Sequence, residues 1–320
     1  MSVVCISHAE DADGLICAAY LRLLRDAAIT LATYDDFGEA LRNVKAPIDE
    51  VYICDLNIRE GIVEEISRIN NFARVTIVDH HPSAQGLLKS LGESGVEIIH
   101  SLLDCTSILL YEHFREDLGR EAARLAAYAA VSDYFEDGPG ASKLLNRLDR
   151  HLVQHEALIL THALHRRSDT GFRLKVVEEL SRLTIPHRIE GAPDAALAHL
   201  EHVSQLLESL PIVATNTGRL AYVEAMEGAS IGSVAGLLID SLGVDVGLCY
   251  KKEGRDSMSI SIRAARGLDI HLGKISRRLA GRFGGFGGGH SRASGASIPQ
   301  NSYMKFIEAL DSELTREIPN

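Results

Sequence analysis

Apolar positions along the first 100 residues switch repeatedly between the two-residue period of strands and the 3.6-residue period of helices. Short apolar runs rich in β-branched residues predict strands at 3–7, 28–34, 51–54, 75–78 and 96–100. The segments between them predict helices at 14–24, 37–44 and 60–72. Apolar strands that alternate with helices indicate a parallel sheet covered by helices.

The second half of the chain predicts a helical region followed by renewed alternation. Residues 106–183 carry Ala and Leu at helical spacing, with a break at Gly138, Pro139 and Gly140. A polar stretch with prolines at 185–193 is the best linker candidate, and a helix at 194–210 follows it. The remainder predicts strands at 220–225, 244–250 and 257–263, helices at 233–242 and 270–279, and a glycine-dense loop at 281–289.

These patterns predict an α/β fold. Its parts are an N-terminal parallel sheet flanked by helices, a helical connector, and a smaller C-terminal α/β domain with a mixed sheet. The expected domains span residues 1–183 and 211–320, joined by a linker and connecting helix over 184–210.

Composition is that of an ordinary globular protein. The 320 residues are 46% hydrophobic and 24% charged, which excludes a disordered or low-complexity chain. No apolar run approaches the roughly 18 residues that span a bilayer, and the first seven residues lack the basic start of a secretory signal. Five cysteines without a C-x-x-C pair are typical of reduced thiols, so we expect a cytoplasmic protein without membrane partners.

Charge is distributed unevenly. The whole chain carries a net charge of −11, which argues against a generic nucleic-acid-binding module. Residues 251–300 nevertheless contain ten Lys or Arg against three acidic residues, a net charge of +7. A basic segment on an acidic protein predicts a local site for an anion, although a solvated helix face would give the same count.

Polar residues follow three of the predicted strands. His8, Asp11 and Asp13 lie where the first strand gives way to a helix, and Asp55 directly follows residues 51–54. The sequence Asp79-His80-His81-Pro82 follows residues 75–78. Single carboxylates at such positions are also common helix caps, but two imidazoles beside a carboxylate at a strand end favour a metal site.

Asp133 ends an apolar helical stretch and would by itself be read as a surface acid. Together the four segments supply five carboxylates and three imidazoles, enough for two divalent cations with one bridging carboxylate. Oxygen-rich sites with some imidazole suit Mn²⁺, with Mg²⁺ as the alternative. Two such ions can activate water and neutralise a phosphoryl group.

These motifs resemble the DHH phosphoesterase superfamily, which is named for the Asp-His-His of its third motif. The resemblance covers roughly residues 1–135 and 215–300. The second part resembles the DHH-associated domain of the RecJ-like and nanoRNase branch, through Gly288-Gly289-His290 and the strand around Arg263. The family's Ala-Ala-Gly is Ala-Ser-Gly here, at residues 293–295.

The resemblance implies roles for individual residues. One cation would bind His8, Asp11 and Asp55, and the second would bind Asp13, Asp55, His80 and Asp133. His81 would contact the scissile phosphate and serve as a general acid, oriented by Asp79. Arg263, Gly288, Gly289 and His290 would bind a substrate phosphate, because glycine exposes backbone N–H groups and Arg grips phosphate bidentately. A flexible hinge is the alternative reading of the glycine run.

The expected function is a Mn²⁺-dependent phosphodiesterase or exonuclease that hydrolyses short oligonucleotides. The low aromatic content of 5%, with no Trp, argues against a long stacking platform for single strands. A cyclic-dinucleotide phosphodiesterase and a 3′-phosphoadenosine 5′-phosphate phosphatase are the alternatives within this chemistry. The alternative of another class is a non-catalytic replication-associated scaffold, which would have lost metal ligands. The helical middle is also a candidate homodimer contact.

Overall fold

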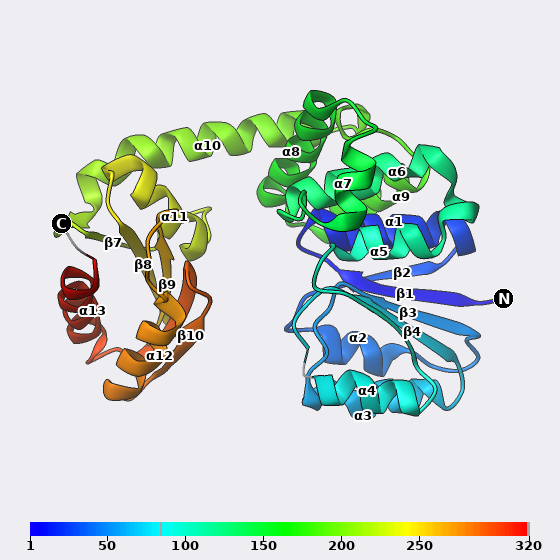
Figure 1. The fold of residues 1–320 in the computed structure, drawn as a ribbon, viewed down its shortest axis with the longest axis horizontal. Coiled ribbons are helices and arrows are strands. Elements are labelled where there is room, and N and C mark those ends of the chain that lie inside the picture. Colours follow the sequence, from blue (N-terminus) through cyan, green and yellow to red (C-terminus); the bar gives the residue numbers. More distant parts are fainter. Residues whose placement is uncertain (84, 319–320) are drawn as a thin grey trace. The chain divides into compact units, whose positions relative to one another are not determined.

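The computed structural model describes residues 1–83 and 85–318. The chain divides into two compact units, Met1–Leu200 and the residues from Glu201 onward. The division falls inside helix α10 (Ala192–Val213), which extends the helix predicted over 194–210 at both ends (Figure 1). Among the described residues, no helix is both long and apolar enough to cross a membrane.

The first unit is built on a five-stranded sheet in the order β2-β1-β3-β4-β5, and all neighbouring strands are parallel. The alternating pattern predicted this sheet. The strands are β1 (Val3–His8), β2 (Ala28–Ala32), β3 (Glu50–Cys54), β4 (Arg74–Asp79) and β5 (Glu97–His100). The helices that cover it are α1 (Ala12–Arg25), α2 (Phe37–Asn43), α3 (Glu60–Asn70), α4 (Gln85–Glu93) and α5 (Thr106–His113).

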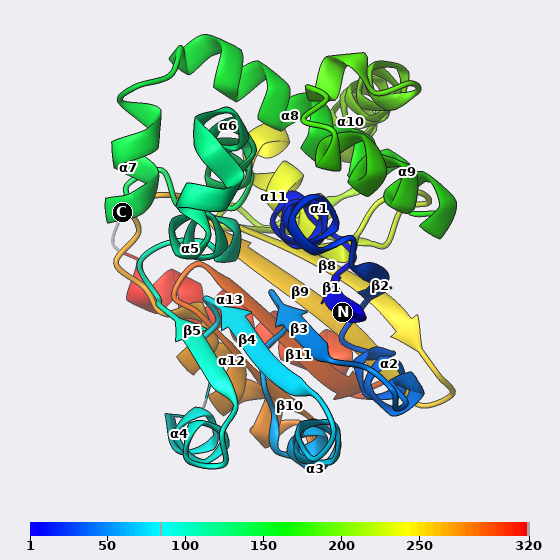
Figure 2. The same cartoon turned by 90° about the vertical axis from the view of Figure 1, so that its right-hand side faces the viewer.

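Helices cover both faces of this sheet, with α1 and α5 on one side and α2, α3 and α4 on the other (Figures 1 and 2). Side chains alternate between the faces along each strand. Ile6 and Ile53 therefore pack with α2 and α3, whereas Cys5 and Cys54 pack with α1. Because both faces are buried, the strands are continuous apolar runs, the pattern by which the sequence predicted them.

A helical region follows the sheet: α6 (Arg115–Ser132), α7 (Pro139–Leu145), α8 (Arg150–Arg166), α9 (Thr170–Ser181) and the 3₁₀ turn η1 (Pro186–Arg188). The predicted break at Gly138–Gly140 is the start of α7, where Pro139 occupies the first helical position. Apolar residues of α6, α8 and α9, including Tyr128 and Leu160, share one core with α1. The helical region is thus packed on the sheet unit.

The second unit has a six-stranded mixed sheet in the order β10-β11-β9-β8-β7-β6. Strands β7 and β8 are parallel and the remaining pairs are antiparallel. The strands are β6 (Thr215–Asn216), β7 (Leu220–Glu224), β8 (Val246–Glu253), β9 (Ser257–Ala264), β10 (Phe286–Gly289) and β11 (Ala293–Pro299). The helices are α11 (Ile231–Leu242), α12 (Leu272–Arg282) and α13 (Tyr303–Glu317). The predicted α/β fold class with a mixed second sheet is confirmed.

The two faces of the second sheet differ in character at β9. Ile260 and Ile262 belong to the core that includes α12 and α13. Ser261 lies between them and Arg263 follows them, so both point to the opposite face, on which α11 packs. The alternation of Ser and Ile in the sequence is thus the signature of one apolar and one polar face.

The glycine-dense segment was expected to be a loop, and that expectation is wrong for its last part. Phe286–Gly289 is strand β10, paired antiparallel with β11. Glycine has low strand propensity, so the sequence carries little strand signal here. The backbone hydrogen bonds of the pair form the strand, and β10 remains an edge strand within the described residues.

Candidate functional site

The catalytic candidates of the first unit lie at one edge of its sheet. His8 ends β1, Asp55 follows β3, and Asp79 ends β4. These three strands are neighbours and parallel, so their carboxyl ends meet where ligands bind in open α/β sheets. Asp55 has a φ of 61°, a left-handed conformation that Asp tolerates better than most residues.

The first potential cation-binding group contains His8, Asp11 and Asp55. Nδ1 of His8 lies 2.9 Å from Oδ2 of Asp11 and 3.5 Å from Oδ2 of Asp55. Asp11 is also the N-cap of α1, because its Oδ1 accepts a hydrogen bond from Gly14 N at 3.0 Å. A Cβ atom on Gly14 would lie 2.2 Å from the His8 carbonyl oxygen, so only glycine allows α1 to start this close to β1.

The second potential group contains Asp13, His80 and Asp133, with one ligand atom from each within 4.8 Å of the others. His80 Nε2 lies 3.4 Å from Asp133 Oδ2. The Asp13 carboxylate accepts backbone N–H bonds at the start of α5, from Thr106 at 2.8 Å and Ser107 at 2.7 Å. The first backbone N–H groups of α5 therefore fix the orientation of the Asp13 carboxylate.

Asp55 lies beside both groups. Its Oδ1 is 3.3 Å from His80 Nε2, whereas its Oδ2 faces His8. The Thr106 hydroxyl donates a hydrogen bond to Oδ1 at 3.0 Å. This is the position that a carboxylate shared by two cations requires.

The electrostatics of the cluster favour cations. Burial, followed by the charges of Asp11 and Asp13, raises the pKa of Asp55 well above its ordinary value. Burial, followed by the charge of Asp13, raises the pKa of Asp133 to about 8. Burial lowers the pKa of His8, but the carboxylates of Asp11 and Asp55 outweigh it and raise that pKa to about 11. The neighbouring carboxylates therefore repel ionised Asp55 and Asp133, which keep their protons to a higher pH than an ordinary Asp.

Two buried polar atoms of the cluster without hydrogen-bond partners also favour cation binding. Asp133 Oδ2 and His80 Nδ1 are buried without a hydrogen-bond partner. Buried polar atoms are normally satisfied, so such orphans need an explanation. Carboxylate oxygens mixed with imidazole nitrogens form a donor set that suits Mn²⁺ or Mg²⁺, and the residues present fit two divalent cations.

His81 lies beside the cluster in a hydrogen-bonded chain. Its Nδ1 is 2.8 Å from Asp79 Oδ1, and its Nε2 is 3.1 Å from the Tyr34 hydroxyl. Sequence reasoning did not single out Tyr34, which lies just past the end of β2. The only available signal was its position at the end of the strand predicted over 28–34. Thr106 and Ser107 were likewise missed, because nothing in the sequence relates them to Asp13.

Arg263 lies on the face of the second sheet that packs against α11. Its Nη1 donates to Ser261 Oγ at 3.0 Å, and burial lowers its pKa. A Cβ atom on Gly232 would lie 2.7 Å from Arg263 Nη2. Gly232 stands in the first turn of α11, so the guanidinium is held against that helix end, a contact that the sequence did not reveal.

The glycine motif lies two strands away at the same end of the sheet. Arg263 is paired with Ala293 of β11, and Gly289 of β10 is paired with the next residue, Ser294. His290 follows β10, is exposed, and donates its backbone N–H to the Ala293 carbonyl at 2.8 Å. A hollow of about 520 Å³ lies beside the motif, and its lining includes Ser257, Ser259, Gly288, Gly295 and Ser297.

Residues 217–316 match the family model of the DHHA1 domain. A search of curated protein sequences found no match. Among solved structures, a DHH-domain protein described as belonging to a family of ribosomal proteins has a TM-score of 0.72 at 17% identity, covering 99% of this chain and 87% of that one.

Two further structures share the fold over essentially the whole chain. A pGpG-specific phosphodiesterase from Vibrio cholerae has a TM-score of 0.61 at 14% identity, covering 99% of this chain and 100% of that one. RecJ from Thermus thermophilus in complex with Mn²⁺ has a TM-score of 0.64 at 17% identity. This chain is covered completely, but it spans only 52% of that RecJ chain.

Proposed function

The chain has the fold of the DHH superfamily with a DHHA1 domain in its C-terminal part, and we propose on that premise that it is a phosphodiesterase or exonuclease that hydrolyses short oligonucleotides. The observation that carries the proposal is the position of Asp55, with one oxygen facing His8 and the other 3.3 Å from His80. This arrangement supports a two-cation centre at the sheet edge. The first ion is assigned to His8, Asp11 and Asp55, and the second to Asp13, Asp55, His80 and Asp133.

Divalent cations bound here, with Mn²⁺ as the expected ion and Mg²⁺ as the alternative, would supply positive charge for the phosphate oxygens and lower the pKa of an attacking water. The chain's own contribution begins with orientation. Backbone N–H groups at the start of α5 hold Asp13, and the Thr106 hydroxyl holds Asp55. These contacts fix the carboxylates before substrate arrives, which is the condition for electrostatic preorganisation.

We assign proton transfer to His81. Nδ1 donates a hydrogen bond to Asp79 at 2.8 Å, which fixes the orientation of the ring and directs Nε2 away from Asp79. When Nε2 also carries a proton, the ring can donate that proton to the leaving oxygen. His81→Ala is expected to lower kcat by about 10²- to 10⁴-fold with unchanged metal content. Loss of bound metal in this variant would instead make His81 a ligand.

We assign substrate binding to the second unit. Arg263 of β9 and Gly289 of β10 pair with adjacent residues of β11, and Gly288 lines a hollow together with Ser257, Ser259 and Ser297. A guanidinium and exposed backbone N–H groups suit a phosphate. The similarity in fold to the pGpG-specific phosphodiesterase over both full chains favours a short linear substrate over a cyclic one.

The test is hydrolysis with Mn²⁺ across a matched panel. The panel contains di- to decanucleotides, cyclic di-AMP, 3′-phosphoadenosine 5′-phosphate and pyrophosphate, with Asp55→Asn as the inactive control. Preference for short linear oligonucleotides is expected. Preference for the cyclic dinucleotide or the mononucleotide would retain the chemistry and replace the substrate, whereas inactivity on all of them with metal bound would favour the scaffold alternative.

A further inference from the structure

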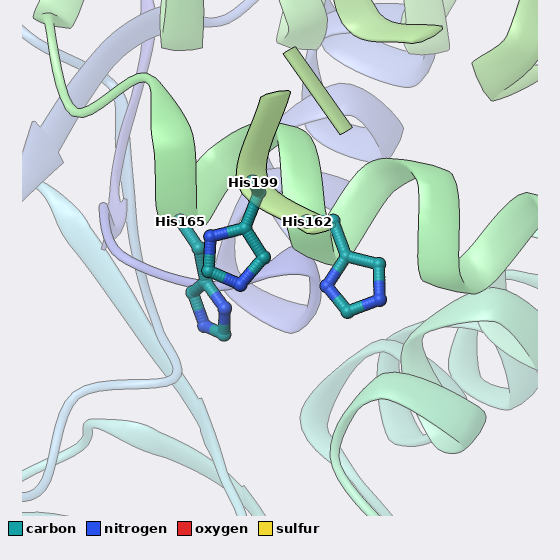
Figure 3. Close-up of side chains that lie close together, drawn as sticks. All are labelled: His162, His165 and His199. Carbon is teal, nitrogen blue, oxygen red and sulfur yellow. The ribbon is translucent and has the colours of Figure 1, made fainter. Parts of the chain in front are cut away.

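Three histidines outside the sheet-edge cluster lie together in the first unit. His162 and His165 are on α8, and His199 is on the part of α10 that belongs to the same unit (Figure 3). One ring nitrogen from each lies within 4.8 Å of the others. Nothing in the sequence relates His199 to the other two, because it lies on a separate helix.

Helix geometry explains how the pair on α8 is presented. Residues three apart lie on the same face of a helix, so His162 and His165 point to the same side. The ring of His199 lies between them: it stacks on His162 with a centroid distance of 5.1 Å and an interplanar angle of 26°, and its centroid is 5.2 Å from that of His165. Figure 3 shows the three imidazoles gathered where α8 and α10 meet.

The chemical state of the cluster suits metal binding. Nδ1 of His162 is buried and has no hydrogen-bond partner. Burial lowers the pKa of His162, and the neighbouring His165 lowers it further. Burial also lowers the pKa of His165, although the Asp11 charge opposes this. Near neutral pH these two rings are therefore uncharged and offer lone pairs, whereas protonated rings would repel one another.

We propose that His162, His165 and His199 form a further metal site that binds a borderline transition-metal ion, Zn²⁺ in the first instance. Three imidazoles without carboxylates prefer Zn²⁺, Cu²⁺ or Ni²⁺ over Mn²⁺ or Mg²⁺, which take oxygen ligands. Tetrahedral Zn–N bonds of about 2.0–2.1 Å place nitrogens roughly 3.3 Å apart. Ring rotations of partly exposed side chains close the remaining difference, and water completes the coordination.

The bound ion would cross-link α8 to the start of α10, and so link the two helices within the first unit. This site differs from the sheet-edge centre in donor set and in residues. Zn²⁺ binding to the three histidines can therefore be measured without any measurement of hydrolysis.

The test measures Zn²⁺ binding to the full-length protein by equilibrium dialysis in excess Mn²⁺. Wild type and a His162→Gln/His165→Gln variant are compared with His155→Gln, which removes an exposed histidine from the same helix. The double variant is expected to lose one equivalent of Zn²⁺, while His155→Gln retains it. His199→Gln is expected to raise the Kd for Zn²⁺ by at least about tenfold.

A variant without the sheet-edge ligands distinguishes Zn²⁺ binding at the three histidines from binding at the sheet-edge cluster. An Asp13→Asn/Asp55→Asn variant is expected to keep this Zn²⁺ equivalent. Adding Zn²⁺ should raise the Tm of that variant, whereas it should not raise the Tm of the His162→Gln/His165→Gln variant through this site. With Cu²⁺ as probe, the Asp13→Asn/Asp55→Asn variant should give an electron paramagnetic resonance spectrum with imidazole-nitrogen couplings. Equal Zn²⁺ stoichiometry in wild type and the His162→Gln/His165→Gln variant would overturn the proposal. Loss of this Zn²⁺ equivalent in the Asp13→Asn/Asp55→Asn variant would also overturn it.

Discussion

Oδ1 of Asp55 lies 3.3 Å from Nε2 of His80, and the carboxylate is almost fully buried at 1% exposure. A buried carboxylate within reach of ligands from two other strands is costly without positive charge nearby. The Asp55 carboxylate therefore destabilises the metal-free protein, and the same carboxylate would bind the cations.

Asp55→Asn is expected to reduce kcat more than about 100-fold, because losing a shared ligand should exceed the 10- to 100-fold cost of losing an outer-shell partner. The side chain is isosteric, tolerates the positive φ and can still accept from Thr106. Without metal, the variant is expected to have a higher Tm than wild type, because folded wild type must keep a proton on Asp55 that the unfolded chain releases, a cost that Asn does not carry. Calorimetry of both proteins in EDTA and in Mn²⁺ measures whether the variant has the higher Tm without metal and the lower Tm with it. A kcat equal to that of wild type would contradict the two-cation centre.

The metal-free protein is expected to lose stability as the pH rises. Burial and neighbouring carboxylates raise the pKa of Asp133 from 3.8 to about 8, so the folded state holds a proton that the unfolded state releases. That contribution is fully present below pH 3.8 and is lost by about pH 8. In EDTA, Tm at pH 6 should exceed Tm at pH 8 by a few degrees. Asp133→Asn should flatten this slope, and a slope that stayed unchanged would refute the assignment.

Arg263→Ala is expected to raise KM by about 10- to 100-fold with a small effect on kcat, as loss of a charge-assisted hydrogen bond predicts. Arg278→Gln is the matched control, since it removes an exposed positive charge that pairs with Glu313. Steady-state kinetics on a dinucleotide separates the two variants. Were Arg263→Ala to release bound metal while substrate affinity held, its assignment to substrate binding would be wrong.

Gly273→Ala tests the close packing beneath the glycine motif. A Cβ atom there would lie 2.0 Å from the Gly289 carbonyl oxygen, so α12 and β10 must separate. We expect a loss of about 1–3 kcal/mol in the free energy of unfolding and a raised KM. Gly281→Ala, in the same helix with no atom within 4 Å, should be neutral or stabilise by up to about 1 kcal/mol. Denaturant titration distinguishes them, and equal effects would contradict the role of this contact.

The sequence by itself determined the first sheet and the positions of its polar strand ends. Buried parallel strands are continuous apolar runs, so the residues after them, such as Asp55 and His80, were predicted to lie at one sheet edge. The sequence also indicated the alternation around Ser261 that separates the two faces of β9. These features are local, because each depends on the period of a single segment.

The tertiary structure decided what depends on contacts between distant segments. It formed a strand from Phe286–Gly289 by pairing, where glycine propensity favours a loop. It placed Tyr34 against His81 and Thr106 against Asp13, and it brought His199 to the pair on α8. Periodicity within a helix or strand carries no information about which other element packs on it, so these contacts follow only from the assembled core.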